Sequence, residues 1–383
     1  MKKIAVIGAS YLQLPLIRKA KSMGLETHVF AWECGDAGEK EADHFYPISI
    51  VEKEQILEVC RKTGVDGIVS IASDLAVLTV CYVAQNMGLT SNSIESSRMS
   101  VNKYLMKQAF IENGVPAAKC RLVEGGIIPD LTGLDHPLIV KPTDRSGSRG
   151  VTRLDHPQDD IKAAVEKALD QSMEKRALIE EYVFGDEYSV ECISYEGRHT
   201  LLTVTKKYTT GNPHYIETGH IEPSGLGDSV TARIRDVVFK GLDALQVKYG
   251  ASHTEIKVNG DDIKIIETGA RMGGDMIGST LVELSTGYDF VRAVIDVSLG
   301  NPPAPFTAAV HKNAAIRYLT NDTASKQLSD LRAMHPEVLF EVDDRPGEED
   351  AIFDSSSRKG YYIMVSCDRD LITRFMPEES RES

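Results

Sequence analysis

The first 92 residues alternate short apolar runs with longer amphipathic stretches. Runs rich in β-branched residues predict strands at 3–7, 27–31 and 67–71. Apolar residues at helical spacing predict helices at 12–23, 53–62 and 75–87. Strands that alternate with helices favour a parallel sheet covered by helices, so residues 1–92 are expected to form a doubly wound α/β domain.

The pattern changes at residue 93. A helix is predicted over 101–113, and strands separated by turns follow to about residue 300. Residues 301–383 begin with a proline-rich stretch, carry strand-like runs at 314–318 and 361–365, and end in a polar tail at 377–383 that we expect to fray. Three parts are therefore expected, with boundaries at 1–92, 93–300 and 301–383.

Composition and charge restrict the class of protein. The chain has 383 residues, of which 42% are hydrophobic and 26% are charged, as in ordinary globular proteins. Its net charge of −14 disfavours nucleic acid and anionic membranes as partners. Six widely spaced cysteines support neither a disulfide framework nor a zinc site, and no apolar stretch reaches the roughly 20 residues of a membrane span. We expect a cytoplasmic protein that binds neither nucleic acid nor membrane.

An apolar run at 138–142 contains Lys141 and is followed by the loop Ser146-Gly147-Ser148-Arg149-Gly150. Backbone N–H groups of such a glycine-bearing loop fit phosphate oxygens, so the segment suits a triphosphate. A surface hairpin with a solvated lysine fits these residues equally well. The Walker sequence Gly-Lys-Ser/Thr is absent.

Residues 177–191 predict a strand, a turn and a second strand, with acidic residues in between. Backbone groups there could meet a nucleotide base, and a carboxylate could meet a ribose. Taken alone, such a segment more often forms a solvated acidic turn than a nucleotide site.

Residues 254–271 predict a β-hairpin that carries Glu255, Glu267 and Arg271. An acid on each strand suits Mg²⁺, which takes one or two carboxylates together with phosphate oxygens. The apolar positions favour a register that puts the two glutamates on opposite faces. A three-residue loop or a β-bulge would put them opposite each other on one face. The metal requires that arrangement, and of the two we expect a bulge.

These segments occur in the order seen in the ATP-grasp superfamily, and the chain resembles an ATP-grasp carboxylate-amine ligase. Residues 1–92 are similar to the domain that precedes ATP-grasp in the large subunit of carbamoyl-phosphate synthase. The resemblance implies a Rossmann-like preATP-grasp domain, an ATP-grasp α+β domain at 93–300 whose two subdomains hold ATP in their cleft, and a small carboxy-terminal α+β region that completes the substrate site.

The resemblance also implies roles for individual residues. Lys103 and Lys141 would contact ATP phosphates, and Ser146, Gly147, Ser148 and Gly150 would close over them. Glu180, Glu181 and Val183 would line the adenine site, with Glu180 and Val183 using backbone atoms, and Glu187 would hold the ribose. Glu255 and Glu267 would ligate Mg²⁺, with Mn²⁺ as a substitute. The superfamily signature has asparagine where this chain has Gly269, which removes one ligand to a second metal ion.

The substrate end is similar to that of bacilysin-type L-amino-acid ligases. They share Glu-x-Gly-Ala-Arg, which ends here at Arg271, and a segment like Glu217-Thr218-Gly219-His220, which we expect in a loop. Those ligases carry tryptophan at the position of Asp275, so the side-chain pocket should differ. Lys206 and Lys207 could reach the γ-phosphate, but a doubled lysine at a strand end is usually solvated, and we expect that here.

The expected activity is ATP- and Mg²⁺-dependent ligation of a small carboxylate, such as an amino acid, to an amine, with release of ADP. Arg271 would hold the carboxylate, and His220 and Glu217 would act on the amine. An enzyme that activates bicarbonate or formate and a catalytically silent ATP-binding regulator are the alternatives. Partners are expected to be small molecules, and a homodimer is compatible with the sequence.

Overall fold

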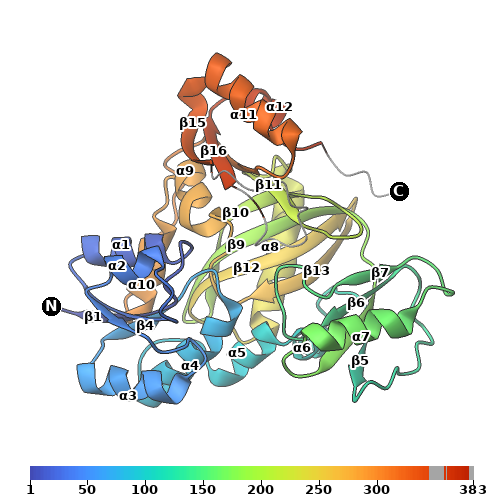
Figure 1. Ribbon diagram of the computed structural model, residues 1–383, viewed down its shortest axis with the longest axis horizontal. Helices are drawn as coiled ribbons and strands as arrows, with labels where there is room; N and C mark the ends of the chain where they lie inside the picture. Colours follow the sequence, from blue (N-terminus) through green and yellow to red (C-terminus); the bar gives the residue numbers. More distant parts are fainter. Residues whose placement is uncertain (345–357, 359, 379–383) are drawn as a thin grey trace.

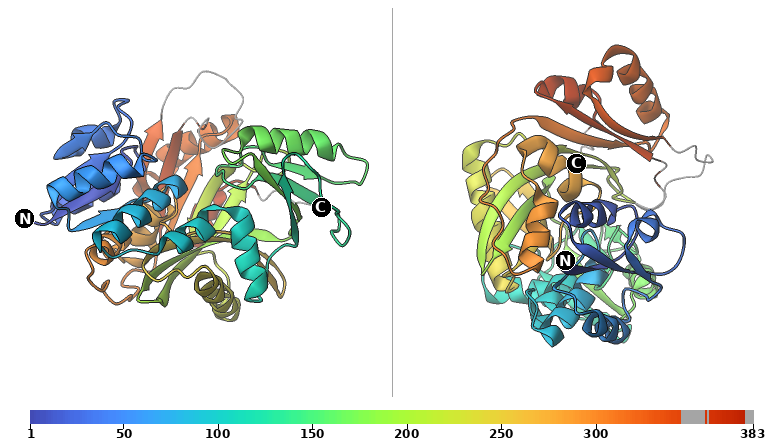
Figure 2. Two further views of the ribbon diagram at one scale, coloured as in Figure 1. Left: turned by 90° about the horizontal axis from the view of Figure 1, so that it is seen from below. Right: turned by 90° about the vertical axis from the view of Figure 1, so that its left-hand side faces the viewer.

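The structure is a computed structural model that describes residues 1–344, 358 and 360–378. Three sheets form the molecule: a parallel four-stranded sheet near the amino terminus, an eight-stranded sheet in the middle and a second four-stranded sheet. The two small sheets lie on opposite sides of the large one (Figure 1, Figure 2). Most of the predicted polar tail, 379–383, lies outside the described residues. Among the described helices, none is long and apolar enough to cross a membrane.

The amino-terminal sheet confirms the Rossmann-like prediction. Its strands run in the order β3-β2-β1-β4, all parallel, with β1 at Lys3–Ile7, β2 at Glu26–Phe30, β3 at His44–Tyr46 and β4 at Gly67–Val69. The predicted helices are present as α1 (Leu14–Ser22), α3 (Lys53–Thr63) and α4 (Asp74–Met87). Sequence patterns missed β3 and the short helix α2 (Ala37–Glu41), since three and five residues are too few to show a period.

The eight-stranded sheet has the order β13-β12-β9-β10-β11-β14-β16-β15 and is antiparallel throughout. Its first five strands are β9 (Asp186–Tyr195), β10 (Arg198–Thr209), β11 (Glu217–Glu222), β12 (Gly250–Asn259) and β13 (Asp262–Gly269). The other three are β14 (Asn313–Tyr318), β15 (Leu339–Asp344) and β16 (Gly360–Ser366). The carboxy-terminal strands therefore extend the central sheet instead of forming a sheet of their own.

The second small sheet has the order β5-β8-β6-β7, with β5 at Cys120–Glu124, β6 at Leu138–Pro142, β7 at Thr152–Leu154 and β8 at Arg176–Glu181. Helix α7 (Ile161–Gln171) packs on it. The strand-turn-strand predicted at 177–191 is thus a crossover from β8 in this sheet to β9 in the large one. The crossover carries acidic residues past the junction between the two sheets.

The remaining helices are α5 (Ile94–Val101), α6 (Lys103–Glu112), α8 (Asp228–Ala244), α9 (Val282–Thr286), α10 (Phe290–Ser298), α11 (Asp322–Met334) and α12 (Arg369–Arg374). Short π- and 3-10 helices occupy Ile277–Leu281 and Pro336–Val338. Asn102 ends α5 and caps α6, because its side chain accepts hydrogen bonds from the N–H groups of Tyr104 and Leu105. The cap fixes Lys103 at the first turn of α6.

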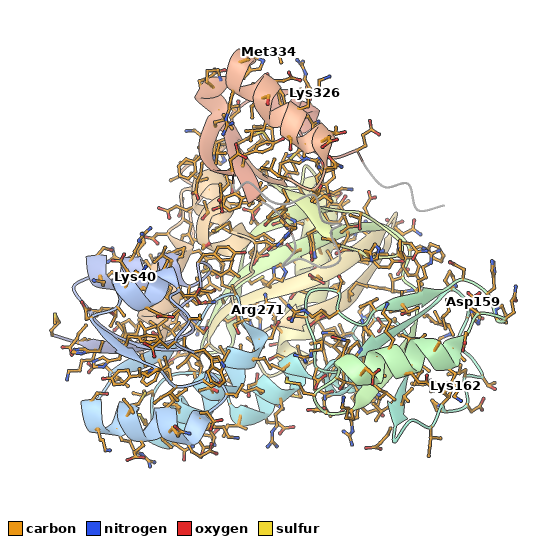
Figure 3. The ribbon with its side chains drawn as sticks, viewed as in Figure 1. Lys40, Asp159, Lys162, Arg271, Lys326 and Met334 are labelled. Atoms are coloured by element: carbon orange, nitrogen blue, oxygen red, sulfur yellow. The ribbon has the colours of Figure 1, made fainter. Side chains whose placement is uncertain are left out.

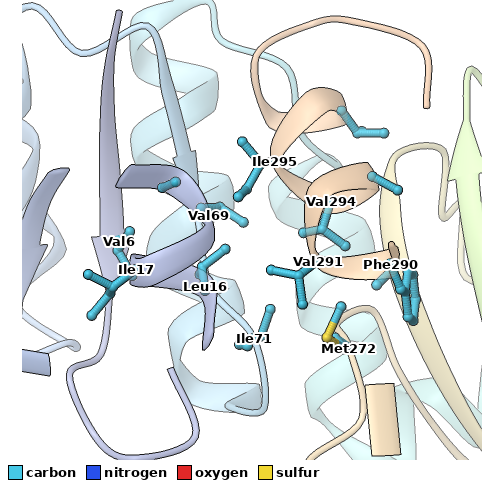
Figure 4. Packing of buried hydrophobic residues seen from close by; sticks show 14 of the residues in the cluster. Val6, Leu16, Ile17, Val69, Ile71, Met272, Phe290, Val291, Val294 and Ile295 are labelled. Atoms are coloured by element: carbon cyan, nitrogen blue, oxygen red, sulfur yellow. The ribbon is translucent and has the colours of Figure 1, made fainter. Parts of the chain in front are cut away.

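One apolar cluster joins the amino-terminal sheet to the large sheet. Leu16 and Ile17 of α1 pack with Val291 and Val294 of α10, and Met272 lies in the same cluster (Figure 4). These side chains are almost completely buried. Because Met272 follows the site residue Arg271 directly, the cluster holds the amino-terminal sheet against the segment that leaves β13.

Candidate active site

A cleft of about 770 Å³ is lined by residues of the large sheet, of the second small sheet and of the segments that follow β1 and β4. Arg271 lies near the middle of the molecule, between the amino-terminal sheet and the large sheet (Figure 3). All predicted site residues except Gly150 line this cleft: Lys103, Lys141, Ser146, Gly147, Ser148, Glu180, Glu181, Val183, Glu187, Glu217, His220, Glu255, Glu267 and Arg271. Residues far apart in the sequence are thus brought into one site.

The apolar positions favoured opposite faces for Glu255 and Glu267, whereas a metal ion requires one face, and the register of β12 and β13 satisfies both. Ile256 pairs with Ile265, as the apolar positions require, and both are completely buried. The register then shifts, so that Glu255 pairs with Glu267 and Ile266 is the extra residue. The predicted bulge is confirmed, and both carboxylates line the cleft.

Each of these two carboxylates contacts a lysine. Lys103 Nζ donates to Glu267 Oε1 at 2.6 Å, and Lys207 Nζ donates to Glu255 Oε1 at 2.6 Å. Lys207 also lies 3.0 Å from a carboxylate oxygen of Glu187. Burial alone would lower the pKa of Lys207, but Glu255, Glu187 and Glu217 raise it well above its ordinary value.

The expectation that the doubled lysine is solvated was wrong. The side chain of Lys207 is only 3% exposed and lines the cleft, while Lys206 contacts Asp186 and the ring of Tyr188. Neighbouring residues of a strand point to opposite faces, so only one of the two lysines can face the site. The same alternation, applied to the sequence, would have predicted that one of the two lysines faces the site.

His253 and Glu191 form a buried pair beside Glu255 that the sequence did not indicate. His253 Nδ1 lies 2.6 Å from Glu191 Oε1, and Nε2 lies 3.7 Å from Glu255 Oε1. Burial alone would lower the pKa of His253, but the contact with Glu191 outweighs it and raises this pKa to about 9. Lys207 and His253 together overcome the effect of burial and hold the pKa of Glu255 well below its ordinary value.

The side chain of Glu180 is buried between two lysines. It contacts Lys141 of β6 and lies 3.3 Å from Lys107 of α6. Despite burial, these cations hold the pKa of Glu180 below its ordinary value. Lys107, which the sequence did not indicate, is completely buried. The two lysines and Glu180 therefore form a buried charged cluster between β6, β8 and α6.

The loop after β6 lies over the cleft through Ser146, Gly147 and Ser148. Gly147 has φ +71° and Ser148 has φ +58°, so two successive residues adopt the left-handed conformation. The hydroxyl of Ser148 donates to the carbonyl oxygen of Tyr215 at 3.1 Å, which ties the loop to the opposite wall. The prediction that Gly150 faces the phosphates is not supported, because it does not line the cleft and its Cα lies so close to Pro142 and Gln171 that a Cβ would be 3.0 Å and 3.1 Å from them.

Arg271 is held by a residue of the amino-terminal sheet region. Its Nε and Nη2 donate to the two carboxylate oxygens of Asp74 at 2.8 and 2.9 Å. Asp74 begins α4, directly after the loop that follows β4. A Cβ on Gly269 would lie 3.0 Å from Asp74 Oδ1 and 3.1 Å from Arg271 Cζ. The absence of a side chain at Gly269 therefore provides the space that this ion pair occupies.

A second arginine-carboxylate pair lies at the other side of the same segment. Asp275 accepts from Arg358 Nη1 at 2.8 Å and Nη2 at 2.5 Å, and its Oδ2 lies 3.3 Å from His220 Nε2. The guanidinium of Arg358 stacks 3.7 Å from the ring centre of Tyr318. Burial opposes ionisation, but Arg358 and His220 hold the pKa of Asp275 far below its ordinary value.

The placement of Glu217 and His220 in a loop was wrong. They lie in strand β11, where His220 pairs with Lys207 of β10 and with Ile316 of β14. His220 is completely buried although it lines the cleft wall. The sequence around 217–222 contains a central glycine and an acid at each end, which obscured the strand pattern.

Asp74 and Arg358 were missed because nothing in their local sequence marks them. For Asp74 a signal exists: ligands of open parallel sheets bind beyond the carboxyl ends of the strands, and Asp74 follows β4 at that edge. Arg358 lies outside the strands, two residues before β16, and meets Asp275 only in the folded chain, so no local signal could have found it.

Comparison with known proteins agrees with this arrangement. The family described as the ATP-grasp domain matches residues 134–279. The alanine–anticapsin ligase of Bacillus subtilis strain 168 is 27% identical over 273 residues, which cover 64% of this chain and 56% of that protein. The D-alanine–D-alanine ligase of Syntrophobacter fumaroxidans is 30% identical over 210 residues, or 50% of this chain and 64% of that protein. The chain thus spans less than two thirds of these curated relatives.

Solved structures share the whole fold. An L-amino acid ligase from Bacillus licheniformis has a TM-score of 0.82 and 21% identity, covering 98% of this chain and 96% of that one. The ADP complex of an N5-carboxyaminoimidazole ribonucleotide synthetase has a TM-score of 0.79 and 17% identity, covering 98% and 95%. At such identities the likeness concerns the fold.

Proposed function

We propose, from the match of residues 134–279 to the ATP-grasp domain, that the chain is an ATP- and Mg²⁺-dependent, ADP-forming ligase that joins a small carboxylate to an amine. The observation that carries the proposal is the bulge in β13, which sets Glu255 and Glu267 side by side in the cleft. Three lysines surround this pair of acids, and Arg271 lies beyond it.

The lysine-rich end of the cleft suits a nucleoside triphosphate. Lys103, Lys141 and Lys207 are each bonded to a carboxylate in the structure, and each could exchange that partner for a phosphate oxygen. The glycine-bearing loop at 146–148 lies over the same end with its backbone in the left-handed region. Glu181, Val183 and Glu187 line the neighbouring wall, where the base and ribose would lie.

Glu255 and Glu267 fit a magnesium site. Mg²⁺ binds through one or two carboxylates plus phosphate oxygens, and these two oxygen ligands come from paired residues on adjacent strands. Bound there, the ion would offset negative charge on the transferring phosphoryl group. Gly269 offers no side chain, so Glu255 and Glu267 are the ligands that β12 and β13 can supply.

Arg271 would hold the substrate carboxylate. Asp74 occupies the Nε and Nη2 edge of its guanidinium. Nη1 donates only a long hydrogen bond of 3.4 Å to the carbonyl oxygen of Met272, which a substrate carboxylate could replace. Burial opposes the charge of Arg271, but Asp74 raises its pKa further above its already high ordinary value, so it stays charged. A fixed cation next to the metal ligands suits both the bound carboxylate and the oxyanion that forms later.

The reaction would proceed in two displacements. A carboxylate oxygen of the substrate attacks the γ-phosphorus of ATP, ADP leaves, and an acyl phosphate forms. The amine nitrogen then attacks the acyl carbon, phosphate leaves, and the amine loses a proton as the amide forms. The side chains of this chain position the reactants and balance charge, and a covalent enzyme nucleophile is not required. Glu217 and His220 line the wall where the amine would enter.

The choice of an amino acid as the carboxylate rests on the relatives, whose names describe ligases of alanine and of other amino acids. Asp275, Arg358 and Tyr318 make the substrate end polar and aromatic. Activation of bicarbonate is the second candidate, because the fold is shared with a synthetase of a carboxyamino product.

Trapping the acyl phosphate tests the proposal. Protein, ATP and Mg²⁺ are incubated with hydroxylamine and single amino acids, and hydroxamate and ADP are measured. We expect hydroxamate for at least one amino acid, and loss of at least a hundredfold in Arg271→Lys, since lysine keeps the charge but lacks the planar fork. Glu58→Gln, an exposed change on α3, serves as the matched control.

Stimulation of ADP release by bicarbonate alone, with no hydroxamate from any amino acid, would replace the ligase proposal by the carboxylase-like one. Tight ATP binding with no turnover under any of these conditions would indicate the silent regulator.

A further inference from the structure

Two imidazoles and one carboxylate converge on the amino-terminal sheet, outside the cleft. His28 of β2 pairs directly with His44 of β3, so their side chains lie on the same face of the sheet. Glu26 precedes His28 by two residues on β2 and therefore shares that face. None of the three lines the active-site cleft. The sequence separates His44 from the others by sixteen residues or more, and only the strand register joins them.

The three side chains point their ligand atoms at one position. Glu26 Oε1 lies 3.1 Å from Nε2 of His28 and 3.1 Å from Nε2 of His44. The two imidazole rings stack with their centres 4.7 Å apart, and one ligand atom from each residue lies within 4.8 Å of the others. In a tetrahedral site with bonds of about 2.0–2.1 Å, ligand atoms are roughly 3.3 Å apart. The two distances of 3.1 Å between the glutamate oxygen and the imidazole nitrogens are close to that value.

His28 is prepared as a ligand by its surroundings. Its side chain is 3% exposed, and its other ring nitrogen, Nδ1, lies 3.0 Å from the hydroxyl of Tyr46. Such an outer contact fixes the ring of a metal-bound histidine.

We propose that Glu26, His28 and His44 form a binding site for a divalent transition-metal cation of the zinc type. Two imidazole nitrogens and one carboxylate oxygen favour such an ion over Mg²⁺, which takes oxygen ligands. The side chain of His44 is 51% exposed, so water completes the coordination from the solvent side. Without the cation, the Glu26 oxygen accepts hydrogen bonds from both imidazoles instead.

The bound ion would tie the edge strand to its neighbour. β3 has three residues and pairs only with β2, so it has few other contacts to hold it. A ligand that binds the folded protein alone raises its stability in proportion to the logarithm of its concentration. The site is therefore structural, and it is independent of the proposed ligase activity.

Zinc binding to the full chain tests this inference. The protein is stripped with a chelator, and Zn²⁺ is added without nucleotide in competition with a chromophoric chelator. The matched variants are His44→Gln and Glu26→Gln, and the control is His156→Gln, which removes an exposed histidine outside the cluster. His44→Gln is the key variant, because its exposed side chain can be changed without disturbing the core. A Cys34→Ser variant controls for the exposed thiol near Asp36 and Glu39.

We expect one equivalent of Zn²⁺ to bind wild type, His156→Gln and Cys34→Ser alike, and the affinity to fall at least tenfold in His44→Gln and Glu26→Gln. Zn²⁺ should also raise the thermal midpoint of wild type more than that of His44→Gln. Equal Zn²⁺ affinity in wild type and His44→Gln overturns the site. So does loss of binding in Cys34→Ser alone, which would place the metal in the loop after β2.

Discussion

Charged side chains in the cleft are balanced pair by pair. Glu267 has Lys103, Glu255 has Lys207, and Glu180 has Lys141 and Lys107. A buried charge without a partner costs several kcal/mol, which explains why no acid here stands alone among the described cleft residues. Nucleotide binding must therefore exchange partners, with phosphate oxygens replacing carboxylates at the lysines.

Lys141→Met is expected to lower ATP turnover at least a hundredfold. Methionine keeps the length of the side chain but removes the charge, and one transition-state charge contact is worth about 2.7–4 kcal/mol. Glu180 keeps Lys107 as its partner, so the protein should remain folded. Steady-state ADP release and circular dichroism check both points. Turnover equal to wild type would remove Lys141 from the phosphate site.

His253 predicts a pH dependence of stability. The folded-state pKa of about 9 lies above the ordinary value of 6.5, so the protonated imidazole stabilises the folded protein fully below pH 6.5. That contribution is lost as the pH rises towards 9. In urea unfolding, the difference in stability between wild type and His253→Gln should shrink over this window by about 1.4 kcal/mol per unit of pKa difference. A constant difference from pH 6 to 9.5 would contradict the charged contact with Glu191.

At the scale of elements, the bulge in β13 lets one hairpin satisfy two demands. Ile256 and Ile265 remain on the core face, while one extra residue, Ile266, brings Glu267 round to the cleft face. Helix α8 covers the core face closely: a Cβ on Gly241 would lie 2.6 Å from Ile265 Cδ1. A glycine inside a helix costs about 1 kcal/mol relative to alanine, so close packing is the reason for it here.

This contact predicts coupled effects of two substitutions. Gly241→Ala should lower the free energy of unfolding of wild type, because overpacking costs about 1–3 kcal/mol. Ile265→Val removes the colliding Cδ1 at a cost of about 0.5–1.5 kcal/mol. In that background Gly241→Ala should raise stability, since the helix gains alanine without the collision. Urea unfolding of both single variants and the double variant measures the coupling, and additive effects would exclude it.

At the scale of the whole molecule, each part contributes to the substrate end of the cleft. The amino-terminal sheet region supplies Asp74, and the segment after β13 supplies Arg271. The carboxy-terminal region brings Tyr318, at the end of β14, and Arg358, just before β16. The N–H of Ala72 also donates to the carbonyl oxygen of Met272 at 3.2 Å. The matched family segment, 134–279, therefore holds only part of the site.

Asp74→Asn should raise the KM for the carboxylate at least tenfold while the KM for ATP changes less. Asparagine has an oxygen acceptor at one terminal atom and an NH₂ donor at the other, so it cannot accept from Nε and Nη2 on two separate atoms, and Arg271 loses its fixed orientation although it keeps its charge. Gly269→Ala should act in the same direction, because its Cβ approaches Asp74 Oδ1 to 3.0 Å. Hydroxamate formation at varied amino acid and ATP concentrations measures both constants. An equal rise in both KM values would point to general loss of structure.

The sequence by itself determined the order of the elements and most of the nucleotide end. Apart from β3 and α2, the strands and helices of residues 1–92 follow from local period, and β1 was predicted at its observed bounds. Lys141 and the loop at 146–148 stood out beside a short apolar run, and the two glutamates stood out on a predicted hairpin; all of them line the cleft. The three-part division at 92 and 300 and the roles of the site residues remain predictions.

Only the tertiary structure decided how distant charges meet. Asp74 reaches Arg271 across 197 residues, and Arg358 reaches Asp275 across 83, because separate sheets pack around one segment. Local sequence indicates whether a segment forms a helix or a strand and which of its residues share one face. It does not contain which cation neutralises which buried acid, since that depends on desolvation and distance, which exist only after the sheets have packed.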